Sequence, residues 1–292
     1  MTATIIRGDH MAAEIREELK ARVQTLKQKR ITPGLAVILV GEDPGSVSYV
    51  KSKAKSAAEI DMFEETIHLP VNTSEAEITK IINKLNENAK FHGILVQLPL
   101  PSHINTDAII SRISPEKDAD GLHPFNMGKL LRGEPGTLPC TPHGVQEMLM
   151  RSGNDPSGKH VVICGRSNLV GKPLAGILMQ KRKGANAIVT LCHTGAKDMS
   201  YFTKQADIVV AAMGVPNAIT ATMIREGSVV IDVGVNRVAD ATRERGYRLV
   251  GDVDFEAVKE KASAITPVPG GVGLMTVTML LMNTVEAAER TA

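Results

Sequence analysis

The sequence predicts an α/β protein of two domains, each built around a parallel sheet. Its 292 residues are enough for about two domains with cores of their own. Continuous apolar runs at 35–40 and 161–164 are typical of strands that are buried on both faces of a parallel sheet. Helical segments alternate with such runs in both halves of the chain, which favours right-handed βαβ units. We therefore expect an N-terminal αβα domain followed by a Rossmann-type domain.

Composition and charge narrow the class of protein. Hydrophobic residues at 43% and charged residues at 23% are ordinary for a globular chain. A net charge of +2 gives no argument for nucleic-acid or membrane binding, and no run approaches the roughly 18 apolar residues of a membrane span. The three cysteines, Cys140, Cys164 and Cys192, form neither a disulfide framework nor a zinc pattern. We therefore expect no metal site. Because residues 1–9 also lack a secretory signal, we expect a cytoplasmic protein.

The first half begins with alternating helices and strands. Apolar residues at helical spacing predict a helix from Asp9 to about 30, and Ser46 is the expected N-cap of a second helix that ends near 60. Ser74 and Glu77 form a capping box at the start of a third helix. The strands expected around these helices are 35–40, 64–69 and 93–97.

Two stretches between the halves differ from the rest of the chain: residues 114–121 are polar and turn-rich, and we expect 133–139 to be irregular. Thr141 and Pro142 then suit the start of a connecting helix to about 151. The second half ends in a Pro/Gly-rich loop at 264–273 and a helix at 276–289, which we expect to return to the first domain. The strands expected in this half are 161–164, 187–191, 208–212, 229–233 and a short one at 251–253.

A glycine loop follows the strand at 161–164 and precedes a helix. Its residues Gly165-x-Ser167-x-x-Val170-Gly171 are a degenerate form of the dinucleotide fingerprint, because Ser167 and Val170 stand where glycines are usual. Such a loop directs backbone N–H groups and a helix N-terminus at a pyrophosphate. By itself the motif fits an ordinary strand–helix turn equally well, but its place in a series of alternating strands favours a nucleotide site.

The next strand indicates which cofactor binds. An NAD site usually has an acidic residue at the end of that strand, but this strand ends in Leu191-Cys192-His193-Thr194. Arg166, in the glycine loop, can pair with a 2′-phosphate. NADP is therefore favoured over NAD, and the alternative for Arg166 is an ordinary surface arginine.

In the first half, chemically useful side chains follow the carboxyl ends of the predicted strands, where parallel sheets bind ligands. Tyr49 and Lys53 are one helical turn apart after the first strand, and Gln97 ends the third. Asp118 and Asp120 lie in the next turn. Taken singly, each also has an ordinary interpretation. Lys53 could belong to a solvated basic helix face, Gln97 could simply end a strand, and the two aspartates could simply form a turn. Their agreement on one edge predicts a substrate site in which a desolvated Lys53 acts as acid or base.

Seven motifs along the chain resemble one known family, the bifunctional methylenetetrahydrofolate dehydrogenase/methenyltetrahydrofolate cyclohydrolases. The resemblance covers nearly the whole chain, and the motifs occur in the family's order. They are Tyr49-Val50-x-x-Lys53, Gly93-Ile94-Leu95-Val96-Gln97-Leu98-Pro99-Leu100-Pro101, Lys117-Asp118-x-Asp120-Gly121, Pro139-Cys140-Thr141-Pro142, Gly165-Arg166-Ser167-x-x-Val170-Gly171-x-Pro173, Ile231-Asp232-Val233-Gly234 and Thr266-Pro267-Val268-Pro269-Gly270-Gly271-Val272-Gly273.

The resemblance implies two reactions. The enzyme would oxidise 5,10-methylenetetrahydrofolate to the methenyl form with NADP⁺ and then hydrolyse that product to 10-formyltetrahydrofolate, which serves one-carbon metabolism and purine biosynthesis. It further implies that Lys53 is the acid or base, that Gln97 orients it, that Tyr49 stacks on the folate and that Asp120 anchors the pterin. The other implied folate contacts are Val96, Leu98, Pro267, Val268, Pro269, Gly270 and Gly271. The implied cofactor contacts are Gly165, Arg166, Ser167, Thr194 and Val235.

The resemblance also implies a homodimer, with a folate-binding catalytic domain from 1–140 plus 270–292 and an NADP-binding domain from 141–269. One position departs from the family pattern, because Leu274 stands where proline is usual. A leucine there has a backbone N–H that proline lacks, which loosens the turn and bears on folate affinity but not on reaction type.

Two other interpretations remain. Short-chain dehydrogenases share the Tyr-x-x-x-Lys spacing of Tyr49 and Lys53, but their pair follows the nucleotide loop, whereas here it precedes that loop by more than a hundred residues. A non-enzymatic NADP-binding regulator is the other interpretation. The combination of Lys53, Gln97 and Asp120 argues against it.

Overall fold

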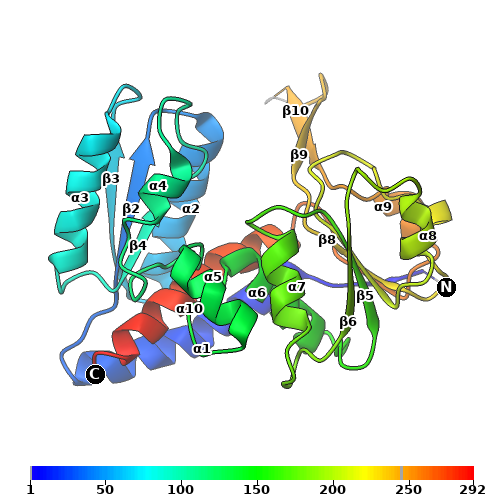
Figure 1. Ribbon diagram of the computed structural model, residues 1–292, viewed down its shortest axis with the longest axis horizontal. Coiled ribbons are helices and arrows are strands. Elements are labelled where there is room, and N and C mark those ends of the chain that lie inside the picture. The colour runs from blue at the N-terminus through cyan, green and yellow to red at the C-terminus, as the bar shows by residue number, and fades with distance from the viewer. Residues whose placement is uncertain (1, 244–245) are drawn as a thin grey trace. The chain divides into compact units, whose positions relative to one another are not determined.

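The computed structural model describes residues 2–243 and 246–292, which fall into two compact units (Figure 1). The first unit consists of Ala13–Cys140 and Val277–Ala292, and the second of Met1–Ala12 and Thr141–Thr276. Residues 1–12 and 270–276 therefore belong with the Rossmann-type part of the chain by their contacts. The division into a folate-binding domain (1–140 plus 270–292) and an NADP-binding domain (141–269) stays a prediction.

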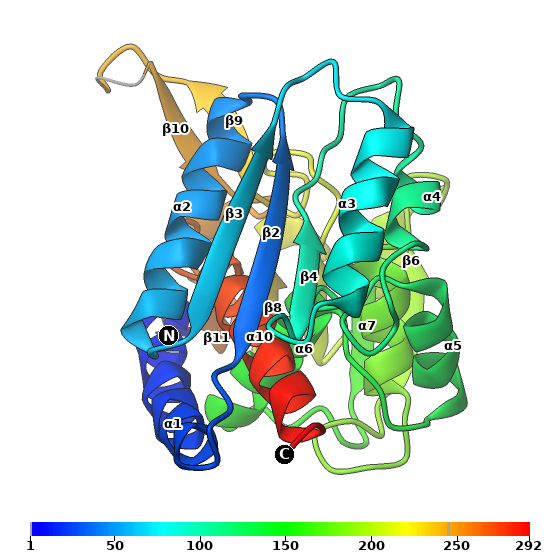
Figure 2. The same cartoon turned by 90° about the vertical axis from the view of Figure 1, so that its left-hand side faces the viewer.

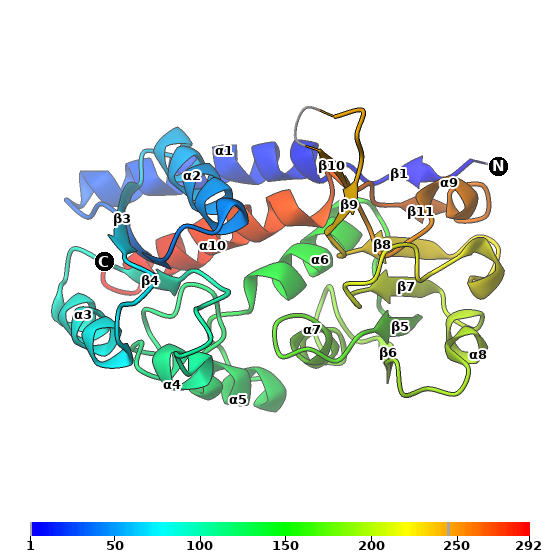
Figure 3. The ribbon, with the colours of Figure 1, turned by 90° about the horizontal axis from the view of Figure 1, so that it is seen from above.

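The first unit is built on a small parallel sheet in the order β3-β2-β4. Its strands are β2 (Gly34–Val40), β3 (Phe63–Leu69) and β4 (Gly93–Val96), as expected from the apolar runs. Every residue of β2 and β4 is buried. Helices α2 (Pro44–Glu59) and α3 (Glu75–Glu87) cover opposite faces of the sheet (Figures 2 and 3). This is the predicted αβα layering.

The alternation of side chains along β2 explains how one strand serves both layers. Ala36, Ile38 and Val40 pack with Ile78 and Ile82 of α3 in one apolar cluster. The intervening residues of β2 face the other side of the sheet. The capping box between Ser74 and Glu77 at the start of α3 is present as predicted.

The C-terminal helix α10 (Val272–Glu289) begins four residues earlier than expected and belongs to the first unit from Val277 onward. Asn283 on this helix donates hydrogen bonds of 2.9 Å to the carbonyl oxygens of both Ala119 and Leu138. The long helix α1 (Gly8–Gln28) also lies largely in this unit. It begins at Gly8, so that Asp9 lies in its first turn and is not the residue before it.

Several predicted boundaries were wrong for local reasons. Asp43, not Ser46, caps α2, because Pro44 occupies the first helical position and the Asp43 carboxylate accepts the Ser46 N–H at 2.8 Å. The connecting helix α6 (Cys140–Arg151) starts one residue before Thr141. Between 114–121 and 133–139, where no element was predicted, the chain forms α5 (Pro124–Arg132), which starts with proline and is followed by Gly133 in the left-handed conformation. A short helix, α4 (Thr106–Ile110), precedes it.

The second unit has a six-stranded parallel sheet in the order β1-β11-β8-β7-β5-β6, which confirms the Rossmann-type prediction. Helices α6 and α7 (Gly171–Leu178) lie on one face, and α8 (Met199–Thr203) and α9 (Phe255–Val258) on the other (Figures 1 and 3). The strands are β1 (Thr4–Ile5), β5 (His160–Cys164), β6 (Ile188–Cys192), β7 (Ile208–Ala211), β8 (Val229–Asp232) and β11 (Ala264–Ile265).

Two features of this unit were not predicted. An antiparallel pair, β9 (Asn236–Ala239) and β10 (Tyr247–Val250), follows β8, and a 3₁₀ turn occupies Ala221–Met223. The short strand expected at 251–253 is reduced to a single bridge between Val253 and Ile219.

Candidate active site

A buried lysine and a glutamine meet at the carboxyl edge of the first unit's sheet. Lys53 is 4% exposed, and its Nζ donates a hydrogen bond of 2.8 Å to Oε1 of Gln97, which is 8% exposed. The Gln97 Nε2 donates in turn to the carbonyl oxygen of Leu98 at 2.6 Å. The amide group is thereby oriented with its oxygen toward the amine.

The local fold explains why these two side chains meet. The helix α2 follows β2, and β4 is the parallel neighbour of β2, with Ile38 paired to Val96. Gln97 directly follows β4, and its backbone N–H donates to the Ile38 carbonyl oxygen at 2.8 Å. Lys53 was expected on the helix after the first strand and Gln97 at the end of the third, and the structure brings the two side chains together.

The surroundings of Lys53 disfavour its charged form. Burial lowers the pKa of Lys53 below its ordinary value, and the negative charge of Asp120 opposes this shift in part, as does Cys140. An amine in this position holds its proton less firmly than a surface lysine. It can therefore exchange a proton with a bound ligand nearer neutral pH.

Tyr49 lies one turn before Lys53 on α2, with the Lys53 Nζ 4.7 Å from the centroid of its ring. The ring is partly exposed, so that one part contacts the lysine and another is accessible to a ligand. Lys51 and Lys55 are exposed, so these two lysines do form a solvated basic face.

The two aspartates of the next turn have different surroundings. Asp118 is 2% exposed, and its carboxylate accepts backbone N–H groups of Gly121, Leu122 and His123 at 2.9–3.2 Å. It holds the turn together. Asp120 is partly exposed and acts electrostatically on Lys53. The structure therefore places Asp120, rather than Asp118, beside the lysine.

In the second unit, the glycine loop lies between β5 and α7. Gly165 has a φ of +133°, and a Cβ atom there would lie 2.1 Å from the Ala212 carbonyl oxygen. At Gly171 a Cβ atom would lie 2.0 Å from the Gly165 carbonyl oxygen. Glycine is therefore required at both ends of the loop. Ser167 Oγ accepts the Val170 N–H at 3.1 Å, which shapes the turn between them.

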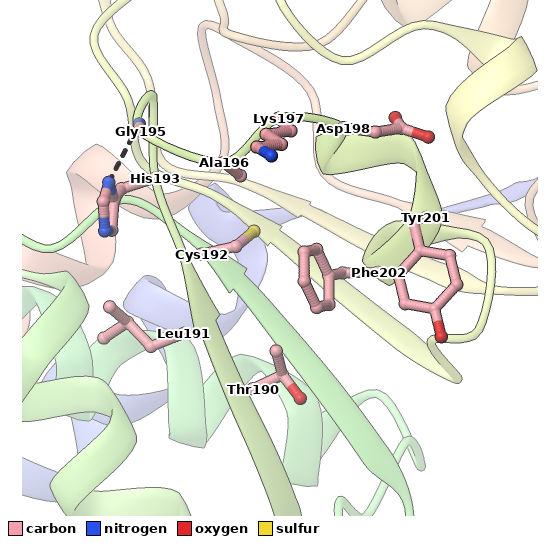
Figure 4. A pocket seen from close by; sticks show the side chains of 10 residues that line it. All are labelled: Thr190, Leu191, Cys192, His193, Gly195, Ala196, Lys197, Asp198, Tyr201 and Phe202. Atoms are coloured by element: carbon pink, nitrogen blue, oxygen red, sulfur yellow. Dashed lines mark hydrogen bonds between the residues drawn. The ribbon is translucent and has the colours of Figure 1, made fainter.

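Arg166, Ser167 and Thr194 are exposed, as is Val235 at 59%, and all four lie near the carboxyl ends of strands in the second unit. A cavity of about 500 Å³ lies beside the end of β6 (Figure 4). Residues of 190–193 and 195–198 form one side of it, and Tyr201 and Phe202 of α8 the other. An exposed arginine beside a glycine loop fits a cofactor with a 2′-phosphate.

The loop that contains Pro267, Val268, Pro269, Gly270 and Gly271 belongs to the second unit, whereas Lys53, Gln97 and Asp120 belong to the first. Its contact with folate therefore stays a prediction. The Gly8 N–H donates to the Gly270 carbonyl oxygen at 2.9 Å, which ties the loop to the start of α1. The N–H of Leu274, which a proline would lack, donates to the Gly271 carbonyl oxygen at 3.4 Å.

Sequence reasoning assigned no role to two buried carboxylates of the second unit. Asp252 is fully buried and accepts N–H groups from Met213, Gly214 and Val215 at 2.6, 2.9 and 3.0 Å. Asp232, at the end of β8, accepts the backbone N–H of Asp252 at 2.9 Å, and burial raises its pKa to about 6. These carboxylates hold the chain that follows β7 and β8.

A sequence signal for these acids did exist. A Cβ atom on Gly234 would lie 2.1 Å from Asp252 Oδ1, and one on Gly251 would lie 1.8 Å from Asp232 Oδ2. Each acid is thus matched by a glycine on the segment opposite. The pairs Asp232-x-Gly234 and Gly251-Asp252 can be seen in the sequence once the pattern is known.

Residues 2–243 and 246–292 lack two further features. They contain no group of three or more histidine, cysteine, aspartate or glutamate residues arranged to hold a metal ion. Among the same residues, no helix has the length and apolar character needed to cross a membrane.

Comparison with known proteins matches both parts of the chain to one family. Residues 6–120 match the tetrahydrofolate dehydrogenase/cyclohydrolase catalytic domain, and residues 139–292 match the NAD(P)-binding domain of the same family. The bifunctional protein FolD of Syntrophus aciditrophicus is 53% identical over 292 residues, which cover 100% of this chain and 99% of that protein.

Two solved structures extend the comparison. The bifunctional enzyme FolD of Campylobacter jejuni has a TM-score of 0.94 and 48% identity, and the match covers 99% of this chain and all of that one. The Trypanosoma brucei enzyme, which was solved with an NADP cofactor and an inhibitor, has a TM-score of 0.94 and 40% identity over 100% of this chain and 99% of that one.

Proposed function

This chain belongs to the tetrahydrofolate dehydrogenase/cyclohydrolase family, and on that premise we propose that Lys53, oriented by Gln97, is its acid–base group. The enzyme oxidises 5,10-methylenetetrahydrofolate to 5,10-methenyltetrahydrofolate with NADP⁺ and then hydrolyses the product to 10-formyltetrahydrofolate. The single observation that carries the assignment of Lys53 is the 2.8 Å hydrogen bond between its buried Nζ and Gln97 Oε1.

The residues of the second unit fit NADP. Gly165 and Gly171 allow the loop between β5 and α7 to pack tightly at the helix N-terminus, and Arg166 supplies a cation for a 2′-phosphate. We propose that Gly165, Arg166 and Ser167 hold the phosphates, with Thr194 and Val235 beside the cofactor. When bound, the cofactor supplies the acceptor for the hydride that leaves the one-carbon bridge.

Hydrolysis is where Lys53 is needed. Water adds to the carbon of the methenyl cation, and an uncharged Lys53 takes the proton that this water loses. The bond from that carbon to N5 then breaks, N5 gains a proton, and the formyl group stays on N10. One proton is released overall. The lowered pKa of Lys53 keeps part of it uncharged, as a base requires.

Gln97 accepts a hydrogen from the amine, so the nitrogen lone pair of uncharged Lys53 is directed away from Gln97. Tyr49 then presents its ring to the folate, and Asp120 accepts N–H groups of the pterin. We propose further folate contacts from Val96 and Leu98, on either side of Gln97, and from the loop of Pro267, Val268, Pro269, Gly270 and Gly271.

We further propose that the enzyme acts as a homodimer in the cytoplasm and that its product supplies purine biosynthesis. The family resemblance supports both statements. Light scattering of the purified chain measures the first, since a molar mass near twice 31.3 kDa is expected.

The assignment of activity is tested by following NADPH absorbance at about 340 nm with methylenetetrahydrofolate and NADP⁺ as substrates. We expect a rise in absorbance that depends on the folate. Folded protein that gives no rise with NADP⁺ would contradict the dehydrogenase assignment.

A further inference from the structure

Two cysteine residues end neighbouring strands of the second unit's sheet. Cys164 is the last residue of β5 and Cys192 the last residue of β6, and the register of the two parallel strands pairs them directly. Both are buried, at 0% and 4% exposed. Their Sγ atoms lie 3.6 Å apart, and both residues belong to the buried apolar cluster against which Phe202 of α8 packs.

The backbone at this position allows a disulfide. Paired residues on neighbouring strands have Cα atoms about 5 Å apart, within the roughly 4.4–6.8 Å that disulfides require. The sulfur atoms must approach to about 2.05 Å, a closure of about 1.5 Å from their present separation. Much of this can come from rotation about the Cα–Cβ bonds, because both side chains already point to the same face of the sheet.

The two thiols differ in access. Cys192 lines the 500 Å³ cavity beside α8, whereas Cys164 does not. In Figure 4 the Cys192 sulfur points into the space between Ala196 and Phe202. A molecule as small as a hydroperoxide can enter a cavity of this size, so Cys192 is the thiol that it reaches first.

The two thiols also differ in acidity. The hydrogen bond between them lowers the pKa of Cys192 and raises the pKa of Cys164, which burial raises further. Cys192 is thus the thiol that ionises first. Since the thiolate is the nucleophile in thiol chemistry, acidity and access both select Cys192 for attack and leave Cys164 as its protonated neighbour.

We propose that Cys192 is a modification site for small hydroperoxides and that Cys164 resolves the product to a Cys164–Cys192 disulfide. The Cys192 thiolate attacks one oxygen of hydrogen peroxide, the O–O bond breaks, and a sulfenic acid and water form after protonation. The Cys164 thiol then passes its proton to the departing hydroxide as its sulfur attacks the Cys192 sulfur, so that the S–O bond breaks, the S–S bond forms and a second water leaves. In total two thiols and one peroxide give one disulfide and two waters.

Oxidation at this place bears on the glycine loop. Gly165 follows Cys164 directly, and its N–H donates to the Cys192 carbonyl oxygen at 2.8 Å. The backbone of Gly165 also packs so closely against the Ala212 carbonyl oxygen that a Cβ atom would not fit. A disulfide across β5 and β6 therefore restrains the start of the loop, and we expect NADP⁺ to bind several-fold more weakly. This consequence rests on the proposed cofactor site, whereas the disulfide itself does not.

The disulfide is tested on the full-length protein by treatment with hydrogen peroxide, followed by blocking of free thiols, proteolysis and mass spectrometry. The expected product is a linked pair of peptides that contain Cys164 and Cys192 and lack two hydrogen atoms. It should disappear on reduction with dithiothreitol. Oxidation that leaves these two thiols free, or that links either of them to Cys140, would overturn the proposal.

Variants separate the two roles, and Cys140→Ala serves as the matched control because Cys140 is a buried thiol of the first unit. In Cys164→Ala, peroxide should leave a sulfenic acid at Cys192 that dimedone traps. Cys140→Ala should form the disulfide as the wild type does. A folded Cys164→Ala protein without a dimedone adduct would remove Cys192 from its role.

The kinetic readout is the KM for NADP⁺ before and after peroxide. We expect a several-fold rise in the wild type, reversed by dithiothreitol, and no rise in Cys192→Ala. If the linked peptides form but the KM is unchanged, the coupling to the glycine loop is refuted while the modification site stands. This outcome is distinct from failure of the proposed function, which would abolish activity in untreated protein.

Discussion

The Nζ atom of Lys53 lies 2.8 Å from Oε1 of Gln97, although the two residues are 44 positions apart in sequence. The contact joins a helix that follows β2 to the residue that follows β4, and these strands are parallel neighbours. Both side chains are buried, so that the hydrogen bond forms away from bulk water.

Replacing Gln97 should change hydrolysis more than hydride transfer. In Gln97→Ala the Lys53 amine loses its oriented acceptor, and we expect methenyl hydrolysis to fall by about 10²-fold. In Gln97→Glu a carboxylate beside the amine should raise the pKa of Lys53 and move the rising limb of the pH–rate profile to higher pH. Stopped-flow decay of methenyltetrahydrofolate at a series of pH values measures both. An unchanged profile in Gln97→Glu would argue against the proton-transfer role.

Lys53 should lower the stability of the fold. Its pKa is lowered in the folded protein, so the unfolded chain binds more protons and stability rises with pH up to the unfolded pKa of 10.5. At neutral pH Lys53→Met should therefore be more stable than the wild type by on the order of 1 kcal/mol, although inactive in hydrolysis. The difference should shrink as the pH approaches 10.5.

Urea denaturation at several pH values measures this effect, and Lys51→Met is the matched control. Lys51 lies on the same helix but is exposed, so its replacement should change stability little. A Lys53→Met protein that is less stable than the wild type at neutral pH would contradict the account of a desolvated amine.

Arg166 should distinguish the two nicotinamide cofactors. Arg166→Ala removes a cation that we place on the 2′-phosphate, and a charge-assisted hydrogen bond contributes about 1.5–3 kcal/mol. The KM for NADP⁺ should therefore rise by roughly 10- to 100-fold, while the KM for NAD⁺ stays nearly constant. Lys181→Ala, which removes an exposed cation after α7, is the control. Equal losses for both cofactors would refute the 2′-phosphate assignment.

Asp252 should be needed for the segment that follows β7. Asp252→Ala leaves three consecutive backbone N–H groups, those of 213–215, without their buried acceptor. We expect a loss of about 3 kcal/mol in the free energy of unfolding and weaker NADP⁺ binding. Asp254→Ala is a nearby control, since its carboxylate makes no cap to α9. Thermal denaturation with and without NADP⁺ checks this, and a wild-type melting temperature would contradict it.

The parts that were predictable from sequence are those set by local pattern. The continuous apolar runs of β2, β4 and β5 predict a parallel sheet, because strands of such a sheet are buried on both faces. Tyr49 and Lys53 share a helix face by spacing, and Gln97 ends a strand. The choice of Lys53 over Lys51 and Lys55 also follows from helix period.

The remainder depends on tertiary contacts. The burial of Lys53 requires knowing that β2 and β4 are neighbours, which no local pattern states. The role of Asp118 was not separable from that of Asp120, because only the fold shows which carboxylate turns toward backbone N–H groups. Asp232 and Asp252 lay in the strands expected at 229–233 and 251–253, and only the fold shows which backbone N–H groups they accept. The preference for Asp43 over Ser46 as a cap depended on Pro44.

The most direct test of the central claim is a paired assay of wild type and Lys53→Ala. Methenyltetrahydrofolate hydrolysis and NADP⁺ binding are measured on the same two preparations. The account predicts that Lys53→Ala loses hydrolysis by at least about 10²-fold and binds NADP⁺ as the wild type does, because Lys53 and the glycine loop belong to different units. Hydrolysis near the wild-type rate in a folded Lys53→Ala protein would contradict it.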